Sequence, residues 1–501
     1  MAHKAKAQSF LDISDKFKLG ELPTEKSHPK TKNLSSLSQS HLDQALEIIK
    51  EIEINLLNIA LSKQSKIKEL TEDVQKALQL GGRIFLCGCG ATGRLSLALE
   101  TIWNKSGKEK GRVISFMAGG DVALIHSIEN FEDHPEFGKR QLEELGFNEN
   151  DLLLAITEGG ETPFVIGAVN AASEVANSAP YFLYCNPDEV LCQTVERSRE
   201  VIENRKIKKL NLCVGEMVLA GSTRMQASTI QMLVAGQALF NFDVNWVQKL
   251  KDKFEEIDFS FLKKFIERES EVYKRNDGVV YSTCDLLGIS VLTDTTERSP
   301  TFSLLPFERN VESRPKQYSL CYLSLEGELE VQRAWTSLLD RTPRCLEWIE
   351  TKELTSIERL YGFDISARNI EKRKSYCSGE QHIFRIELID ESLKFRFEDL
   401  EENIRFEKND LLSIHLILKV LLNTHSTLVM GRLGRYESNI MTWVRPSNNK
   451  LIDRTIRYIL ILLSERGIEK SYEEVCYKLF EVMEEVKKDD PLVLKTLESL
   501  L

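Results

Sequence analysis

Residues 81–105, GGRIFLCGCGATGRLSLALETIWNK, contain the pattern that decides the fold of this chain. The run RIFLCG is short, apolar and bounded by glycines, whereas GRLSLALETIWNK has apolar residues at helical spacing. A strand, a glycine loop and a helix in this order are typical of the first half of a parallel βαβ unit. The change of hydrophobic period after Gly88 therefore predicts an α/β fold.

The same alternation continues on the carboxyl side of this stretch. Further strands are expected in GRVISFMAGG, DLLLAIT, APYFLYCN and KIKKLNLCVG, with helical patterns between them, and GSTRMQASTIQMLVAGQALFNF forms a long apolar closing helix. Strands that alternate with helices predict a parallel sheet covered on both faces. We therefore expect a first doubly wound lobe over residues 81–245.

The pattern starts again at Asp277. Strands are expected in DGVVYSTC, RPKQYSLCYLSL and QHIFRIELI, helices in LLGISVLTDTT and RAWTSLLD, and LLSIHLILKVLLNTHSTLVMGRLGRY repeats the closing helix. The two halves share an order of elements but little sequence, which indicates a diverged internal duplication. The expected fold is two doubly wound parallel-sheet lobes in tandem, with a degenerate second lobe at 277–445.

Four further segments flank these lobes. Residues 1–40 are polar and predict an extended arm, and residues 41–80 have the spacing of a long helix or a helix pair that ends at Gly81. Residues 246–276 read as a charged helical connector, and residues 446–501 as a small helical cap.

Charge and hydropathy exclude several classes of protein. The 66 Lys and Arg residues against 77 Asp and Glu give a net charge of −11, which argues against a general nucleic-acid or anionic-membrane binder. Apolar runs such as LILKVLL and YILILLS are shorter than a membrane span, and no apolar segment follows the first positive charges. We therefore expect a cytoplasmic protein.

Cysteine and histidine give no metal pattern. The 10 cysteines are scattered without a CxxC pair, and the 8 histidines form no ligand cluster. We expect reduced, structural thiols, and the sequence implies no metal and no cofactor.

Three polar loops are the candidate binding elements. Gly88 to Arg94 satisfies GxGxxG, but the nearest acid for a dinucleotide site, Asp121, comes late, and the P-loop Lys is missing. The loop's glycines and the following helix N-terminus suit an anion, and the alternative is a tight turn that needs positive φ. The loops Thr157–Pro163 and Gly221–Arg224 also precede helices, where hydroxyls either cap the helix or bind a phosphate or sugar.

Several motifs together resemble the family that joins the N-acetylmuramic acid 6-phosphate etherases to the glucokinase regulatory protein, built on the sugar isomerase (SIS) domain. The resemblance spans nearly the full chain. The matching segments are Thr24-Glu25-Lys-Ser-His28-Pro29-Lys-Thr31, Gly88–Arg94, Ala118-Gly119-Gly120, Glu129–Asp133, Cys185-Asn186-Pro187, Gly221–Gln226 and Leu422–Met441.

The resemblance implies a sugar-phosphate site shared by two SIS lobes. The etherases' two acid/base glutamates correspond to Glu132 in lobe one and Glu297 in lobe two, because lobe one has Ile102 where the second glutamate would fall. Lys419 matches a lysine that faces the sugar phosphate. The implied binding residues are Gly90, Ala91, Thr92, Gly93, Arg94, Thr157, Gly159, Thr162, Ser222, Thr223, Arg224 and Lys419.

The chain also departs from the family pattern. The usual S-x-S-G of the second loop is Thr157-Glu158-Gly159-Gly160, Glu161 follows it, and the signature lysine is Gln226. An added carboxylate beside a dianion costs affinity unless it points away. In lobe two, Ser282–Gly288 lacks a glycine cradle, so we expect a single phosphate site.

Two functions remain open at this point. The fused lobes and the cap favour a regulator in which a phosphorylated hexose or amino sugar biases binding of a partner such as a sugar kinase. Retention of Glu132 and Glu297 favours the alternative, an etherase-like lyase that releases D-lactate by β-elimination. An isomerase is a weaker third possibility, because no convincing histidine base is present.

Overall fold

The computed structural model describes residues 2–17, 19–128, 131–309, 317–406, 410–446, 448–487 and 490–501. Its first sheet contains five parallel strands in the order β2-β1-β3-β4-β5. These strands are β1 (Ile84–Gly88), β2 (Val113–Met117), β3 (Leu152–Ile156), β4 (Tyr181–Tyr184) and β5 (Lys208–Asn211). The parallel sheet predicted for lobe one is thus confirmed.

Helices cover both faces of this sheet, as the alternating side chains of β1 require. Ile84 and Leu86 belong to one apolar core, whereas Phe85 and Cys87 belong to another. The covering helices of lobe one are α5 (Ala91–Lys105), α6 (Pro135–Glu144), α7 (Pro163–Val175), α8 (Asp188–Thr194), α9 (Glu196–Glu203) and α10 (Gln226–Phe240).

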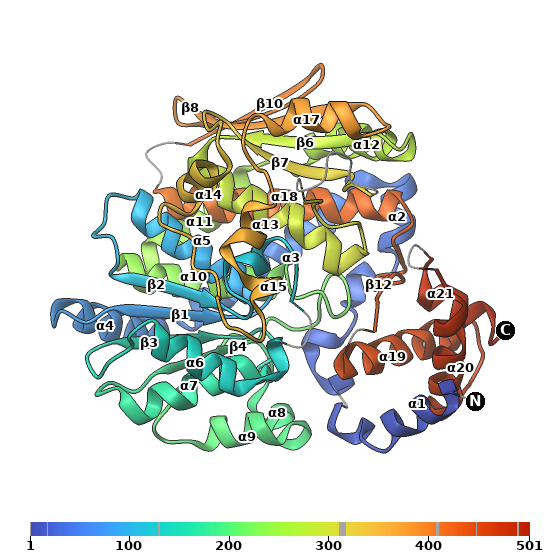
Figure 1. Cartoon of the computed structure of the whole chain (residues 1–501), viewed down its shortest axis with the longest axis horizontal. Helices are drawn as coiled ribbons and strands as arrows, with labels where there is room; N and C mark the ends of the chain where they lie inside the picture. The colour runs from blue at the N-terminus through green and yellow to red at the C-terminus, as the bar shows by residue number, and fades with distance from the viewer. Residues whose placement is uncertain are drawn as a thin grey trace.

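The second sheet has the order β10-β9-β8-β6-β7 and lies at the top of Figure 1. Its strands are β6 (Gly278–Thr283), β7 (Cys321–Leu325), β8 (Gln381–Ile389), β9 (Ser392–Phe397) and β10 (Leu400–Arg405). Strands β6, β7 and β8 are parallel, and β6 lies between the other two, as β1 lies between β2 and β3 in lobe one. The α/β class with two lobes is confirmed, but β9 and β10 are antiparallel and therefore correct the expectation of a wholly parallel second sheet.

Two tight turns explain this difference. Asp390 and Glu391, between β8 and β9, both have positive φ (49° and 58°), and Glu398 at the next turn has φ 56°. Two successive residues with positive φ connect antiparallel neighbours, a role in which Asn-Gly is usual. Because these positions hold acidic residues, the sequence carries no ordinary hairpin signal.

Helices from both lobes pack together between the two sheets (Figure 1). They are α5 and α10 from lobe one and α13 (Asp285–Phe302) and α18 (Leu411–Arg432) from lobe two. One apolar core runs continuously from Leu95 and Leu99 of α5 through α13 to Leu418 of α18. The remaining helices of lobe two are α14 (Val331–Leu339), α15 (Lys352–Thr355), α16 (Ile357–Tyr361) and α17 (Asn369–Tyr376).

The closing helix α18 is also long and apolar enough, by length and composition, to cross a membrane. All of that apolar stretch is buried inside the protein. Its apolar composition is therefore accounted for by its place between the lobes, where a helix is hydrophobic on every side.

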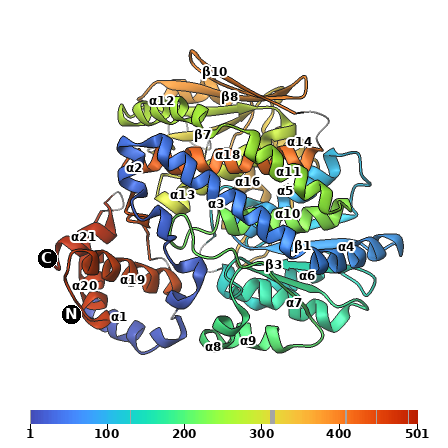
Figure 2. The same ribbon diagram turned by 180° about the vertical axis from the view of Figure 1, so that it is seen from behind.

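The segments outside the lobes are largely helical. The range 41–80 contains α3 (Leu42–Ser62) and α4 (Gln64–Gln79), and the cap contains α19 (Asn449–Glu465), α20 (Tyr472–Glu485) and α21 (Leu492–Glu498). The connector predicted over 246–276 is formed by α11 (Val244–Glu256), which already begins at Val244, and by α12 (Leu262–Lys274). Figure 2 shows α3 crossing the back of the molecule between the lobes.

The N-terminal 40 residues differ from the expected extended arm. They contain α1 (Ala2–Leu11), α2 (Leu34–Ser40) and several 3-10 turns. The helix α1 packs on α20, where Phe10 lies 6.4 Å from Phe480 between ring centroids. Burial of Ala7 and Phe10 against the cap supplies a tertiary partner that the arm's polar sequence does not reveal.

Candidate functional site

The first candidate loop joins β1 to α5 and has the geometry of an anion cradle. Gly90 has φ 56° at the N-cap of α5, and a side chain on Gly93 would come within 2.6 Å of the Met117 Cβ. The Thr92 hydroxyl accepts a hydrogen bond from the Cys89 amide at 2.9 Å and so closes the turn. The glycines therefore serve both the tight turn and close packing, and they leave the helix N-terminus uncovered by side chains.

Arg94 adds a buried cation behind this loop. Its side chain is 1% exposed, one amine donates to the Leu124 carbonyl at 3.3 Å, and Nε has no hydrogen-bond partner among the described residues. Burial lowers the pKa of the Arg94 guanidinium, whereas the nearby carboxyl of Glu297 opposes that shift. Glu297 belongs to α13, so a charge of lobe two faces the cradle of lobe one.

In the second loop, which follows β3, two threonine hydroxyls contact each other. Thr157 and Thr162 lie 3.0 Å apart between their hydroxyl oxygens, and Pro163 begins α7. Thr162 occupies the N-cap position, but within the described residues its side chain accepts no bond from a helix amide. The Gly159 carbonyl accepts a hydrogen bond from Asn186 at 2.9 Å, which ties this loop to the Cys-Asn-Pro segment.

Carboxylates from this loop have opposite environments. Lys450 and Arg197 contact Glu161 at 2.6 Å and 2.5 Å. Burial alone would raise the pKa of Glu161, but these two cations outweigh it and hold the pKa at about 2. Glu158 is also buried, and burial raises its pKa to about 7. Of the two added carboxylates, Glu161 is therefore neutralised by partners and Glu158 is not.

The third loop directs its arginine into lobe two. Arg224 lies 3.3 Å from Asp294, and one amine donates to Ser426 at 3.0 Å and to Thr427 at 2.7 Å. The neighbouring Ser222 is 6% exposed. The guanidinium thus fastens the loop to α13 and α18. Protein groups engage both of its terminal amines, whereas its Nε has no hydrogen-bond partner among the described residues.

Lys419 of α18 crosses the interface in the opposite direction. Its ammonium donates to the Arg224 carbonyl at 2.9 Å, to the Thr229 hydroxyl at 2.8 Å and to Asn423 at 3.1 Å. Burial lowers the pKa of Lys419 to about 8, against the opposing pull of Glu53 and Glu297. Lobe two therefore supplies a buried cation to the start of the closing helix of lobe one.

A small cavity lies at this junction and has a volume of about 20 Å³. Side chains of α5, α10, α13 and α18 enclose it: Ala91, Leu95, Ala98, Ser228, Met232, Ser290, Thr293, Asp294, Glu297, Lys419 and Asn423. Such a volume admits a water molecule, whereas ligand pockets measure about 300–1,000 Å³. Ala91, Glu297 and Lys419, all expected site residues, line it together.

Glu297 is the unpaired carboxyl of this cavity. It is 4% exposed, and no hydrogen bond to it is found among the described residues. Burial raises the pKa of Glu297, while Arg94 and Arg224 pull the pKa down. A buried carboxyl with a raised pKa holds its proton more readily than an exposed one, which suits a general acid.

Glu132 lies on the 3-10 turn Phe131–Asp133 and is not among the residues that line this cavity. One oxygen accepts a hydrogen bond from Asn448 at 3.0 Å, and the other lies 3.7 Å from the Cys89 sulfur. Glu132 is therefore beside the glycine loop, and its charge raises the pKa of the Cys89 thiol in addition to burial. Glu129 of the same motif lies outside the described residues.

The cap contributes residues that sequence reasoning missed. Lys450, in the first turn of α19, pairs with Glu161, and Arg454 contacts Glu25 at 2.6 Å. Burial would lower the pKa of Lys450, but Glu161 and Glu132 outweigh it and raise the pKa. Lys450 and Arg454 lie four residues apart on one face of α19, a spacing that is visible in the sequence. For residues 446–501, however, the sequence pattern predicts only a helical cap.

The structure explains two of the departures from the family pattern. Gln226 accepts from the Val218 amide at 3.1 Å and donates to the Glu216 carbonyl at 2.9 Å, so it braces its own loop. In lobe two, Asp285 occupies the first turn of α13 and contacts Lys105 at 2.5 Å. An acidic side chain thus already lies at the helix N-terminus that corresponds to the cradle of lobe one.

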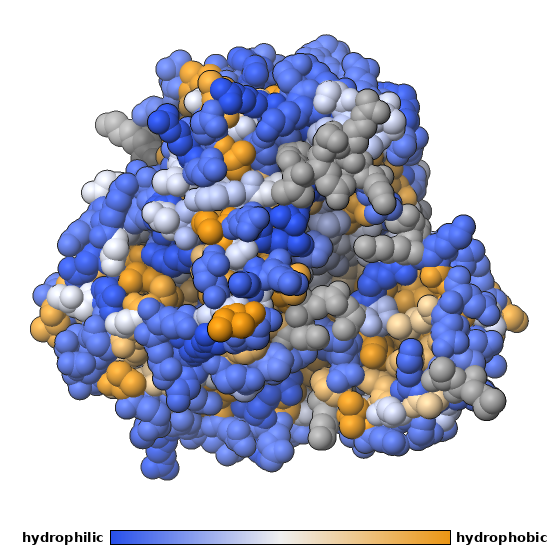
Figure 3. Space-filling view, in the orientation of Figure 1, coloured by the Kyte–Doolittle hydropathy of each residue, from blue (hydrophilic) through white to orange (hydrophobic). Residues whose placement is uncertain are grey.

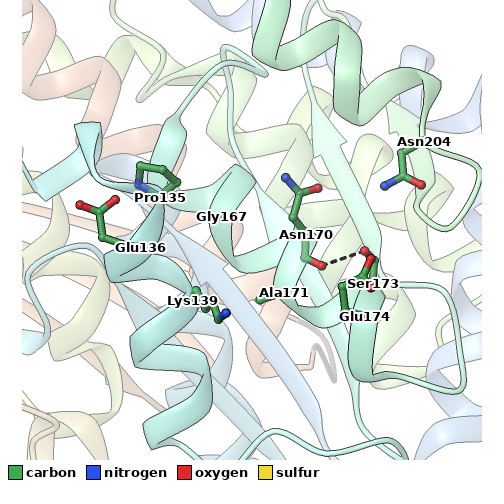
Figure 4. A pocket seen from close by; sticks show the side chains of 9 residues that line it. All are labelled: Pro135, Glu136, Lys139, Gly167, Asn170, Ala171, Ser173, Glu174 and Asn204. Carbon is green, nitrogen blue, oxygen red and sulfur yellow. Dashed lines mark hydrogen bonds between the residues drawn. The ribbon is translucent and has the colours of Figure 1, made fainter.

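A larger hollow of about 430 Å³ lies on the outer surface between α6 and α7, away from these loops (Figure 4). Pro135, Glu136, Lys139 and Ser173 are among its lining residues. Figure 3 shows a mostly hydrophilic outer face with scattered apolar side chains. None of the expected site residues lines this hollow. Among the described residues no group of three His, Cys, Asp or Glu side chains is arranged to hold a metal ion.

Comparison with known proteins identifies the relatives of the chain. Residues 64–173 match the model of the glucokinase regulatory protein N-terminal SIS domain. The N-acetylmuramic acid 6-phosphate etherase of Photorhabdus laumondii is 30% identical over 223 residues, which cover 44% of this chain and 68% of that relative. Etherase 1 of Bacillus licheniformis is 32% identical over 221 residues, covering 43% and 66%.

Solved structures with a related outline include tagatose-6-phosphate ketose/aldose isomerase from Escherichia coli. That match has a TM-score of 0.41 and 12% identity, and covers 78% of this chain and 94% of the isomerase. The sequence matches and the glycine loop support one conclusion. The chain belongs to the SIS-domain family that joins the N-acetylmuramic acid 6-phosphate etherases with the glucokinase regulatory protein.

Proposed function

We propose that this protein binds a phosphorylated hexose or amino sugar between its two lobes and that binding changes how the lobes pack, which regulates a partner such as a sugar kinase. The observation that carries the proposal is the interface cavity. It is lined by both lobes and has a volume of about 20 Å³, far below that of a sugar phosphate. Ligand entry therefore requires the helices to move apart, so binding and lobe arrangement are coupled.

The charges around the cavity suit a phosphate monoester. Lys419 is a buried cation that lines it, Arg94 is a buried cation that acts electrostatically on its Glu297, and the N-terminus of α5 presents backbone amides at the Gly90 turn. Lys450 lies at the rim, close enough to Glu161 for a 2.6 Å contact. A ligand phosphate would compete with Glu161 for this lysine, which gives a route from ligand binding to movement of the cap.

The partner is proposed from the match to the glucokinase regulatory protein over residues 64–173. A sugar kinase from the same organism would be assayed with increasing amounts of this protein, with and without a phosphosugar. The proposal predicts that the protein changes the kinase's apparent KM and that the phosphosugar modifies this effect. An unchanged kinase rate at saturating protein would contradict the partner assignment.

The etherase-like lyase is the second candidate, and Glu297 favours it. This carboxyl lines the cavity without a hydrogen-bond partner among the described residues, and Glu132 lies across the glycine loop. In the lyase reaction Glu132 would remove the proton from C2 beside the ring-opened aldehyde, and Glu297 would protonate the lactate oxygen as its bond to C3 breaks. Addition of water to the resulting double bond would complete the exchange of lactate for hydroxide.

One experiment separates the two candidates. N-acetylmuramic acid 6-phosphate is incubated with the pure protein and followed by proton and phosphorus NMR. Release of D-lactate that is lost in Glu132→Gln and in Glu297→Gln, but retained in the exposed control Glu136→Gln, supports the lyase. Broadening of the phosphorus signal without lactate supports binding alone. If the phosphorus signal does not broaden and no product appears, both candidate functions are overturned.

A further inference from the structure

The carboxyl of Glu158 lies where the three candidate loops converge. Its residue follows β3, and its side chain is 8% exposed. Groups from every surrounding element act on it electrostatically. These are Cys89 of the first loop, Arg94 of α5, Cys185 after β4, the Thr223 hydroxyl of the third loop, Glu297 of α13 and Lys450 of α19. The carboxyl therefore occupies the centre of the anion-binding elements.

This carboxyl is incompletely satisfied. Its Oε1 is buried and has no hydrogen-bond partner among the described residues. Lys450, the cation with the strongest effect on it, makes its 2.6 Å contact to Glu161 instead. A buried carboxyl oxygen without a donor is costly when charged, and it is satisfied most simply by a proton of its own or by a ligand.

The local sequence explains why such a group matters for a ligand. The second loop has Gly159 where the related pattern has a serine, so one hydroxyl donor is missing beside Glu158. A neutral carboxyl carries an O–H that can donate to a phosphate oxygen, whereas an ionised carboxyl only accepts and repels a dianion. Glu158 can therefore replace the missing serine hydroxyl as a donor only when its carboxyl is protonated.

We propose that Glu158 couples phosphosugar binding to proton uptake: the phosphate binds when Glu158 is neutral, and its O–H donates to a phosphate oxygen. The proton comes from solvent when the free protein holds the ionised form. This inference rests on the proposed phosphosugar site and adds to it a residue whose protonation controls binding of the phosphate.

The environment of the group places its titration in a useful range. Burial and, less strongly, the charge of Glu297 raise the pKa of Glu158, whereas a backbone hydrogen bond, Lys450 and the Thr223 hydroxyl lower it, and the resulting pKa is about 7. With a pKa near 7, the neutral fraction rises about tenfold between pH 8 and pH 6. Binding through the neutral form therefore tightens by about the same factor as the pH falls over this range.

The test uses N-acetylglucosamine 6-phosphate, which has no lactyl ether and so cannot undergo elimination. Titration calorimetry of the full chain at pH 6, 7 and 8, each in two buffers with different ionisation heats, gives both Kd and the protons taken up. Glu158→Gln is the matched variant, because it is always neutral and keeps a donor. Glu158→Ala provides a second variant, and circular dichroism checks that both fold.

The wild-type protein is expected to take up about one proton per ligand at pH 8, an uptake that Glu158→Gln lacks. Relative to Glu158→Gln, wild-type Kd should fall about tenfold from pH 8 to pH 6, since titration of the ligand's own phosphate affects both proteins equally. Identical pH profiles and proton counts in the two proteins would overturn this inference alone. Absence of binding by wild type and both variants at every pH would overturn the phosphosugar site and this inference with it.

Discussion

The two lobes place the same elements at their shared interface but keep different chemistry. In lobe one, β1 leads into α5 through the turn at Gly90, which has φ 56°, and the helix N-terminus is open. In lobe two, β6 leads into α13 through Cys284 in an ordinary extended conformation, and Asp285 fills the first turn. Lobe two instead contributes Glu297 and Lys419 to the interface cavity.

From this difference we propose that the two lobes divide one site between them. Lobe one has Ile102, fully buried in the core, at the position that corresponds to Glu297. Lobe two has lost the glycines that an anion cradle requires. In this proposal each lobe lacks what the other keeps, so neither half makes a complete site alone, and the parts meet where α5 packs on α13.

The largest effect is expected from the charge network beneath Glu297 in lobe two. Arg298 is fully buried and contacts Glu269 at 2.6 Å and Asp294 at 3.0 Å. Arg298→Ala would remove the buried cation that both carboxylates share, leave Asp294 with the longer Arg224 ion pair at 3.3 Å, and lower the free energy of unfolding by about 3–5 kcal/mol.

Urea denaturation measures this loss. The control is Arg268→Ala, whose partly exposed pair with Asp399 should contribute less than about 1 kcal/mol. Equal destabilisation by the two changes would contradict the view that lobe two depends on this buried network.

The closing helices predict a difference in acid sensitivity. His415 of α18 is buried with Nδ1 2.7 Å from the Ser290 hydroxyl, and burial lowers its pKa to about 4. The α10 segment Gln226–Phe240 contains no ionisable side chain. Below pH 6.5 the unfolded chain binds a proton at His415 that the folded chain does not, so stability falls as the pH drops from 6.5 toward 4.

The slope is about 1.4 kcal/mol for each pH unit, or about 2 kcal/mol between pH 6.5 and pH 5. His415→Leu should lack this part of the pH dependence when unfolding free energies are compared at the two pH values. Parallel pH profiles of the variant and the wild type would remove His415 as the cause.

A pair of glycine substitutions compares packing behind the two loops. A Cβ on Gly93 of α5 would lie 2.6 Å from the Met117 Cβ, whereas one on Gly288 of α13 would meet the flexible end of Leu325 at 2.9 Å. Gly93→Ala is expected to destabilise by about 1–3 kcal/mol through overpacking. Gly288→Ala should stay within about 1 kcal/mol, because alanine's helix propensity offsets the contact. The reverse order in thermal or urea unfolding would show that the cradle of lobe one is the more adaptable.

The smallest effect concerns ligand binding at the two helix starts. Arg94→Gln removes a buried cation beside the cradle and should raise the Kd for N-acetylglucosamine 6-phosphate by about tenfold. Asp285→Asn neutralises the acid at the corresponding start in lobe two and should change Kd by less than about twofold. A stronger response to Asp285→Asn, measured by calorimetry, would place the phosphate in lobe two.

The sequence was sufficient to predict the α/β class, the repeat and the loops, because strand-loop-helix periodicity is local. It did not predict β9 and β10, since Asp390 and Glu391 adopt positive φ without the usual turn residues. The antiparallel end of the second sheet follows from those turns.

The site could be predicted only in part, because its charged residues pair with residues that are distant in the sequence. Arg224 was expected at a phosphate, but Asp294 and Thr427, far away in sequence, engage its guanidinium. Lys450 was missed for the same reason, because its contact with Glu161 joins the cap to the second loop. Local motifs identify which loops are polar, whereas the pairing of their charges depends on how distant helices pack.

Equilibrium dialysis with radiolabelled N-acetylglucosamine 6-phosphate tests the divided-site account most directly. The account predicts one ligand per chain at saturation, and weaker binding when either Arg94 of lobe one or Lys419 of lobe two is replaced. Two ligands per chain, or binding that survives loss of Lys419 unchanged, would contradict a single site built from both lobes.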